Sequence, residues 1–142
     1  MRARILIIEH QDTHLAAITA SLSSTNHELL VATDAENGVA LARRHRPHLL
    51  LCAIDAPSNG IQVLSKLRVD SSFDSMPIVA VTRFSNQEDR NSLLRRGFRA
   101  VIGKPVPPDF AELVEKFLPT SEGFQRSEQG PQRDRGPSKR EG

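Results

Sequence analysis

Residues 46–57 read Arg-Pro-His-Leu-Leu-Leu-Cys-Ala-Ile-Asp-Ala-Pro, and this stretch decides the fold class. The residues in its centre, 49–54, are continuously apolar, with no alternation between apolar and polar positions. That pattern is typical of a parallel strand that is covered by helices on both faces. The stretch therefore predicts a buried strand of a parallel sheet, with a loop that opens on a polar residue, Asp55.

Outward from this strand, the chain alternates short apolar runs with longer stretches that have the period of a helix. The other apolar runs are residues 5–8, 29–32, 78–81 and 100–102. The helical stretches are residues 12–24, 35–45, about 61–67, 86–96 and a last one from about 108. Five strands and five helices in strict alternation predict the α/β class: a doubly wound (βα)5 fold whose five-stranded parallel sheet carries helices on both faces.

Several helix ends are marked in the sequence. Asp34 can cap the second helix, which has to end before the break at Arg46-Pro47. Gly97 is a natural residue to follow the fourth helix. The fifth helix shows the i, i+3, i+4, i+7 spacing of an amphipathic helix at Phe110, Leu113, Val114 and Phe117.

Length and composition limit the organisation of the chain. The 142 residues have room for one domain, which we place at residues 1–118. From Thr120 onward the only large apolar residue is Phe124. Such a segment buries too little apolar surface to offset its ordering entropy, so residues 119–142 are predicted to form a disordered hydrophilic tail.

Charge, hydropathy and cysteine usage favour a cytoplasmic protein without a membrane segment. No apolar run approaches the roughly 18 residues that a membrane span needs. The net charge of +2 is too small to predict a nucleic-acid partner. The one cysteine, Cys52, lies inside an apolar run, and a buried free thiol suits a reducing compartment.

The candidate site residues are those that open the loops at the carboxyl ends of the strands, where open parallel sheets bind their ligands. They are Glu9-His10, Asp55 to Gly60, Thr82 and Lys104-Pro105. The loop that starts at Glu9 contains no glycine, which excludes a dinucleotide fingerprint, and the chain contains no P-loop.

These loop residues and the strands before them resemble the receiver domains of bacterial two-component signalling. The likeness covers residues 4–118, and its motifs occur in the family's order and at its spacing. They are Ile7-Ile8-Glu9-His10, residues 46–57, Pro77-Ile78-Val79-Ala80-Val81-Thr82, and Gly97 through Lys104-Pro105-Val106. The resemblance implies the flavodoxin/CheY-like receiver fold and a cis peptide bond before Pro105.

The resemblance also implies that the phosphoacceptor is missing. Phosphoryl transfer to an aspartate needs a carboxylate nucleophile, a divalent cation held by oxygens, and donors for the phosphoryl oxygens. In receivers the nucleophile lies six residues after the proline that opens the third strand and four before the proline in the following loop. Counting from Pro47 and from Pro57 gives the same residue, Ala53, whose methyl group cannot accept phosphate.

Other positions of the receiver pattern are altered as well. Glu9 keeps one carboxylate, but the second acidic position holds His10, which is a poor ligand for magnesium. Val101 replaces the aromatic residue that moves on activation, and the loop after the third strand is one residue short. Thr82 and Lys104, the donors to phosphoryl oxygens, remain. The chain therefore resembles the degenerate pseudo-receivers, and we expect no cofactor and at most weak metal binding at a vestigial magnesium site.

The function expected from this pattern is that of an atypical single-domain response regulator. It would be a non-enzymatic module that binds another signalling protein, such as a histidine kinase or a downstream effector, without phosphorylation. We expect a monomer or a weak dimer. Receivers commonly signal through the face formed by the fourth helix, fifth strand and fifth helix. The residues expected at that face are Arg90, Arg95, Arg96, Arg99 and Val101.

Asp55 leaves a second function open. Residues 53 and 55 point to the same face of an extended strand, about 6 to 7 Å apart. Asp55 can then act as a substitute phosphoacceptor, with Mg²⁺ held by Glu9, His10 and Asp55 itself. The other interpretation is an aspartate that caps its own loop.

Lys104 and Thr82 also have structural interpretations, and two other kinds of ligand remain possible: a transition metal and nucleic acid. Lys104 can pair with Glu9 or Asp55 to stabilise the fold, and Thr82 can cap the turn after its strand. His10 and His14, at i, i+4, can chelate a transition metal with Glu9 or Asp55 if both histidines are helical. The basic patches at residues 43–46 and around the fourth helix allow nucleic-acid binding, although 43–46 also fits the solvated end of a helix.

Overall fold

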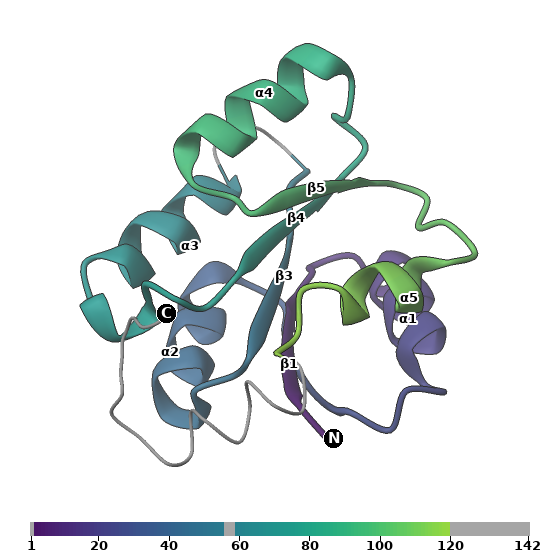
Figure 1. Cartoon of the computed structure of the whole chain (residues 1–142), viewed down its shortest axis with the longest axis horizontal. Helices are drawn as coiled ribbons and strands as arrows, with labels where there is room; N and C mark the ends of the chain where they lie inside the picture. The colour runs from purple at the N-terminus through teal and green to yellow at the C-terminus, as the bar shows by residue number, and fades with distance from the viewer. Residues whose placement is uncertain (1, 56–58, 120–142) are drawn as a thin grey trace, which may run out of the picture.

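The sheet of the computed structural model, which describes residues 2–55 and 59–119, is parallel and five-stranded. The strands are β1 (Arg4–Ile8), β2 (Glu28–Ala32), β3 (Leu49–Ala53), β4 (Ile78–Thr82) and β5 (Ala100–Gly103). They are ordered β2-β1-β3-β4-β5. Figure 1 shows the part of this order from β1 through β3 and β4 to β5. Each predicted apolar run falls in one strand, except that Ile54 lies just beyond β3. The predicted doubly wound sheet is confirmed.

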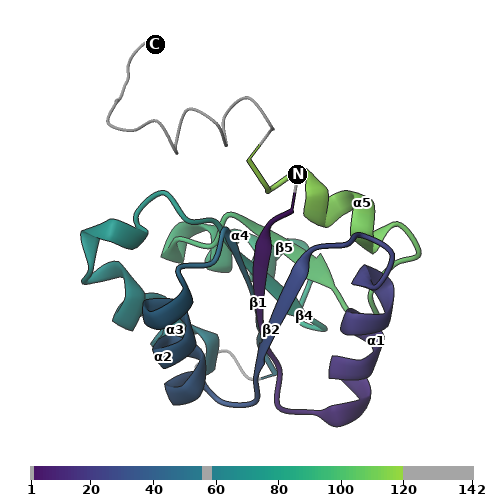
Figure 2. The same cartoon turned by 90° about the horizontal axis from the view of Figure 1, so that it is seen from below.

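Helices cover both faces of this sheet, as predicted. They are α1 (Asp12–Leu22), α2 (Ala35–His45), α3 (Asn59–Arg68), α4 (Gln87–Arg96) and α5 (Phe110–Glu115), together with an unpredicted 3₁₀ turn at Ser71–Phe73. α1 and α5 lie on one face, and α2, α3 and α4 lie on the other (Figure 2). None of the described helices is long and apolar enough to cross a membrane.

The helices begin and end close to the residues that mark them in the sequence. The Asp34 carboxylate accepts a hydrogen bond from the backbone N–H of Asn37 at 2.7 Å, and so caps α2. Gly97 follows α4 with φ at 121°, a conformation that glycine adopts without a steric penalty. α5 ends before its apolar pattern does, but Phe117 still packs against the core.

Two apolar layers hold the helices on the sheet. Alternate strand residues, such as Ile7 and Leu51, face α1 and α5, while their neighbours, such as Leu50, face α2, α3 and α4. Because both faces are covered, the central strands need no polar positions. Cys52 is a buried free thiol in the layer that faces α2, α3 and α4. The two apolar layers hold the strands in place, and the strands position the residues at their carboxyl ends.

Two sequence predictions concern the loops and the tail. The peptide bond between Lys104 and Pro105 is cis, as the resemblance implied. The shortened loop after β3 includes residues 56–58, and the predicted tail of residues 119–142 includes residues 120–142. Both of these ranges, 56–58 and 120–142, lie outside the described residues.

Candidate functional site

Three charged side chains meet at the carboxyl edge of the sheet. Glu9 follows β1, Asp55 follows β3 by two residues, and Lys104 follows β5. The backbone ladder continues one residue past each of these strands, because the N–H groups of Glu9, Ile54 and Lys104 donate to carbonyl oxygens of neighbouring strands at 2.9 to 3.0 Å. The rigid sheet therefore sets where these side chains begin.

The ammonium group of Lys104 is surrounded by acceptors. Its Nζ lies 2.7 Å from Glu9 Oε1, 3.0 Å from His14 Nδ1 and 3.3 Å from Asp55 Oδ1. An ammonium group has three donor hydrogens and no acceptor, so these atoms satisfy it completely. Because an ammonium group only donates, Nδ1 of His14 is the acceptor in this contact. The Lys104 side chain is only 8% exposed.

Glu9 is the buried carboxylate of the group, with none of its side chain exposed. A buried carboxylate is costly unless it is both paired and hydrogen-bonded. Lys104 supplies the charge, and the backbone N–H of Gln11 donates to the second carboxylate oxygen at 3.1 Å. Lys104 thus pairs with both of the carboxylates that sequence analysis named for a structural role.

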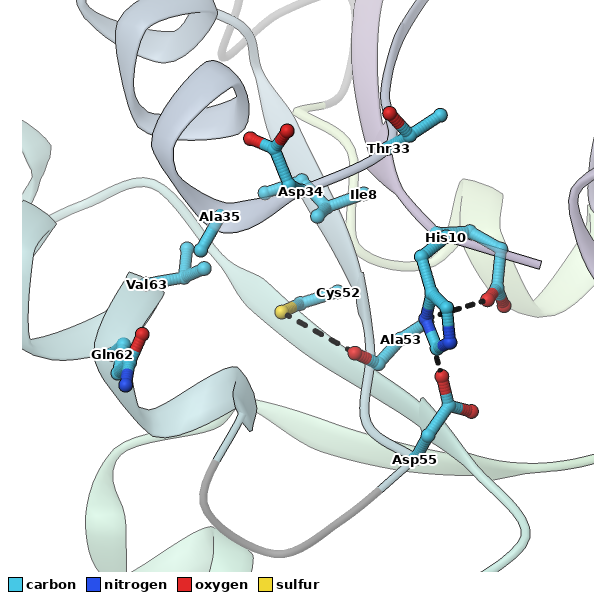
Figure 3. A pocket seen from close by; sticks show the side chains of 11 residues that line it. Ile8, His10, Thr33, Asp34, Ala35, Cys52, Ala53, Asp55, Gln62 and Val63 are labelled. Atoms are coloured by element: carbon cyan, nitrogen blue, oxygen red, sulfur yellow. Dashed lines mark hydrogen bonds and ion pairs between the residues drawn. The ribbon is translucent and has the colours of Figure 1, made fainter.

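Asp55 is turned into the same pocket. Its Oδ2 lies 2.8 Å from Nδ1 of His10 (Figure 3). Its Oδ1 lies 3.3 Å from Nζ of Lys104. Burial alone would raise the pKa of Asp55. The charge and hydrogen bond of Lys104 outweigh this effect, with further help from His10 and the Gln11 side chain, and the pKa of Asp55 is lowered. Among the described residues, the Asp55 carboxylate therefore contacts the side chains of Lys104 and His10.

Ala53 ends β3 beside this group, where it pairs with Val81 of β4. It lines a cavity of about 200 Å³, to which His10 and Asp55 also contribute (Figure 3). Cys52 lines the same cavity, but burial raises the pKa of its thiol to about 12, with a smaller contribution from Glu9. The thiol therefore stays protonated and is a poor nucleophile.

The hydroxyl of Thr82 is engaged inside the fold. It donates a hydrogen bond to the carbonyl of Ile54 at 2.6 Å and accepts one from the backbone N–H of Phe84 at 3.0 Å. Thr82 is fully buried. The second bond caps the turn after β4, and the first ties that turn to the end of β3.

The two histidines both lie within 4.0 Å of the Glu9 carboxylate, but their nearest partners differ. His10 lies before α1 and contacts Asp55, so it does not form a helical i, i+4 pair with His14. The ligand atoms that do cluster are one each from Glu9, His14 and Asp55, all within 4.8 Å of one another. The contact between His14 and Lys104 is not predicted by any sequence motif. The one sequence feature that points to this contact is the position of His14 in the first turn of α1, which begins directly after Glu9 and His10.

The residues expected at the partner surface separate into two groups. Arg95, Arg96 and Arg99 are exposed. Val101 is buried and packs in the core below α4, so it forms no part of a surface. Arg90 is half-buried. It donates from Nη1 to the carbonyl of Val101 at 2.7 Å and from Nε to the carbonyl of Ser85 at 2.8 Å. Arg90 therefore joins α4 to β5, a role that its charged residue type does not reveal.

The basic run at the end of α2 is partly used within the fold. The guanidinium of Arg46 lies 4.5 Å from the centre of the Phe73 ring and 3.8 Å from the Asp70 carboxylate. Arg43 donates to the carbonyl of Lys66 at 3.5 Å. These contacts attach α2 to α3 and the 3₁₀ turn, which is a structural use of basic residues.

Comparisons with known proteins agree with this geometry. The response regulator receiver domain family matches residues 5–117. The chain is 35% identical to the protein PilH of Pseudomonas aeruginosa, over 73% of this chain and 87% of PilH. It is 28% identical to the polar-differentiation response regulator DivK of Brucella anthropi, over 83% and 98%. Among solved structures it is similar to chemotaxis response regulator CheY4 of Vibrio cholerae, with a TM-score of 0.75 at 18% identity over 83% and 100%.

Proposed function

The chain belongs to the response regulator receiver family, and on that basis we propose that it is a pseudo-receiver: a module of two-component signalling that binds other proteins without being phosphorylated. One observation carries the proposal. Ala53 ends β3 and lines one cavity with Glu9 and Asp55, at the position where the resemblance to receivers implies the nucleophile. A methyl group forms no acyl phosphate.

The state of the remaining phosphate-binding groups supports the same proposal. The Lys104 ammonium has its full set of acceptors, and the Thr82 hydroxyl already donates to Ile54. To stabilise a phosphoryl group, both residues would have to give up buried hydrogen bonds, and each buried group left unpaired costs about 1–3 kcal/mol.

The possible ligand atoms at this edge of the sheet do not suit a magnesium ion. Mg²⁺ takes oxygen ligands in near-octahedral geometry. The carboxylates of Glu9 and Asp55 are paired with Lys104, and His10 contributes nitrogen in place of oxygen. We accordingly propose that the pocket works without Mg²⁺ and without any other cofactor.

Incubation with acetyl phosphate and Mg²⁺, followed by intact mass measurement, tests the proposal. We expect no added phosphoryl group on the wild-type chain under conditions that modify a receiver with an aspartate at the corresponding position. A phosphoryl adduct that survives in Asp55→Asn would place the modification elsewhere, and would equally refute the proposal.

The second candidate function is phosphorylation of Asp55, and its orientation into the pocket beside Lys104 favours it. Against it, both carboxylate oxygens already have partners, in Lys104 and His10. The experiment above separates the two functions, because an adduct formed by the wild type and lost in Asp55→Asn establishes this second one.

For the partner we propose a signalling protein with an acidic surface, bound in the cytoplasm by a chain that is a monomer or a weak dimer and has no enzymatic activity. The exposed residues Arg95, Arg96 and Arg99 supply the positive charge at α4 and the start of β5. Nucleic acid is a weaker candidate, because part of the other basic run is used within the fold.

The double variant Arg95→Glu/Arg96→Glu tests this surface. It should capture less partner from a cell extract than the wild type, in a salt-sensitive manner, because charge complementarity governs such encounters. Its fold stability should hardly change, because exposed charges contribute little to folding. Unchanged capture, or capture by the wild type that acetyl phosphate alters severalfold, would contradict the proposal.

A further inference from the structure

The acceptors around Lys104 are arranged like the ligands of a metal ion. One atom each from Glu9, His14 and Asp55 lies within 4.8 Å of the others. The same three residues accept the hydrogen bonds of the Lys104 ammonium, at 2.7 to 3.3 Å. A cation therefore already lies among them, and it is covalently attached to β5 through its own side chain.

The distances and charges of this group suit an ammonium ion better than a metal. Zinc binds nitrogen and oxygen ligands at about 2.0–2.2 Å, so a metal would require the ligands to move inward by roughly 1 Å. The two carboxylates and the one ammonium also leave a single negative charge among these three groups. A divalent ion would meet the Lys104 charge at close range.

We propose that the Lys104 ammonium is the resident cation of this pocket, and that it closes a latent metal site formed by Glu9, His14 and Asp55. The proposal goes beyond the proposed function: it concerns the cation, whereas the missing phosphoacceptor concerns Ala53. The two share the proposed absence of Mg²⁺, so saturable Mg²⁺ binding by the wild type would count against both. A phosphoryl adduct bears only on the missing phosphoacceptor, and the Zn²⁺ titration bears only on the cation.

The metal class of the latent site follows from its donors. One imidazole nitrogen and two carboxylates form a set that zinc accepts, with water completing the coordination. Magnesium requires oxygen ligands throughout. Once the ammonium is removed, the two carboxylates carry two negative charges, and a Zn²⁺ ion neutralises both. The latent site should therefore prefer Zn²⁺ to Mg²⁺.

Calorimetric titration of the full chain with ZnCl₂ and MgCl₂ tests this inference in wild type, Lys104→Met and Lys104→Met/His14→Ala. Methionine keeps the volume of the lysine stem and removes the charge. We expect Lys104→Met to gain one Zn²⁺ site at least about tenfold tighter than any site in the wild type, and to bind Mg²⁺ no better. The double variant is the matched control: it should lose the gained site while other histidines remain.

Two results would overturn the inference. One is a Lys104→Met variant that folds and gains no His14-dependent Zn²⁺ site. The other is saturable Mg²⁺ binding by the wild type that disappears in Glu9→Gln, because the ammonium would then not close the site. If Lys104→Met does not fold, Lys104→Gln replaces it, since its amide still donates hydrogen bonds to Glu9. The wild-type Mg²⁺ titration needs no variant of Lys104 and keeps the inference testable in any case.

Discussion

Arg90 is the contact whose removal should show how firmly α4 is held on the sheet. Its guanidinium donates to the carbonyls of Val101 in β5 and Ser85 before α4, at 2.7 and 2.8 Å. A hydrogen bond from a charged group contributes about 1.5–3 kcal/mol when buried, and roughly half of that at a half-exposed site. Two such bonds predict that Arg90→Ala lowers the free energy of unfolding by about 2 kcal/mol.

Urea unfolding followed by far-ultraviolet circular dichroism measures this change. Arg95→Ala is the matched control, because Arg95 lies exposed on the same helix and its removal should cost less than about 0.5 kcal/mol. Arg90→Lys should fall between the two, since an ammonium cannot place two donors as the guanidinium does. Equal midpoints for Arg90→Ala and Arg95→Ala would show that the two bonds do not hold α4.

Three further predictions concern other parts of the chain. His48 Nδ1 accepts the N–H of Arg4 at 2.9 Å, and burial, Arg4 and His27 lower its pKa. The unfolded chain therefore takes up the proton first, so the unfolding free energy should fall as pH drops below about 6.5, less so in His48→Gln. A pH-independent free energy would count against this. Cys52 should react with a thiol reagent at pH ~8 only after denaturation, given its pKa of about 12 and 1% exposure; rapid labelling of the folded chain would mean that the cavity opens. Truncation after Pro119 should leave the thermal midpoint within about 2 °C, and a larger drop would mean that the tail packs on the domain.

The sheet was predictable because its signals are local and repeated. Each buried strand corresponds to an apolar run such as 49–54, and two of the helices, α2 and α4, begin at capping residues, Asp34 and Asn86. Neither depends on a contact with a distant residue. The strand ends then follow, and with them the meeting of Glu9, Asp55 and Lys104 at one edge.

The side-chain partners within the site were less predictable, because each depends on atoms from several elements. Sequence analysis left Asp55 open between pocket and loop, and only the arrangement of β1, β3 and β5 shows it against Lys104 and His10. It also grouped Arg90 with the exposed arginines, because charge alone does not distinguish a residue that binds backbone carbonyls from one in solvent. Spacing along α4 places Arg90 on a face, and the position of β5 decides its bonds.

The complete engagement of Lys104 has a consequence for any attempt to build a phosphoacceptor into this pocket one substitution at a time. Ala53→Asp would add a carboxylate, but the ammonium nearest to the pocket is already held by Glu9, His14 and Asp55. His10→Asp would add a third carboxylate to a group with a single ammonium, and would remove the histidine that contacts Asp55. Each added carboxylate would thus enter a pocket whose ammonium already has its acceptors, so a working acceptor site would need several substitutions together.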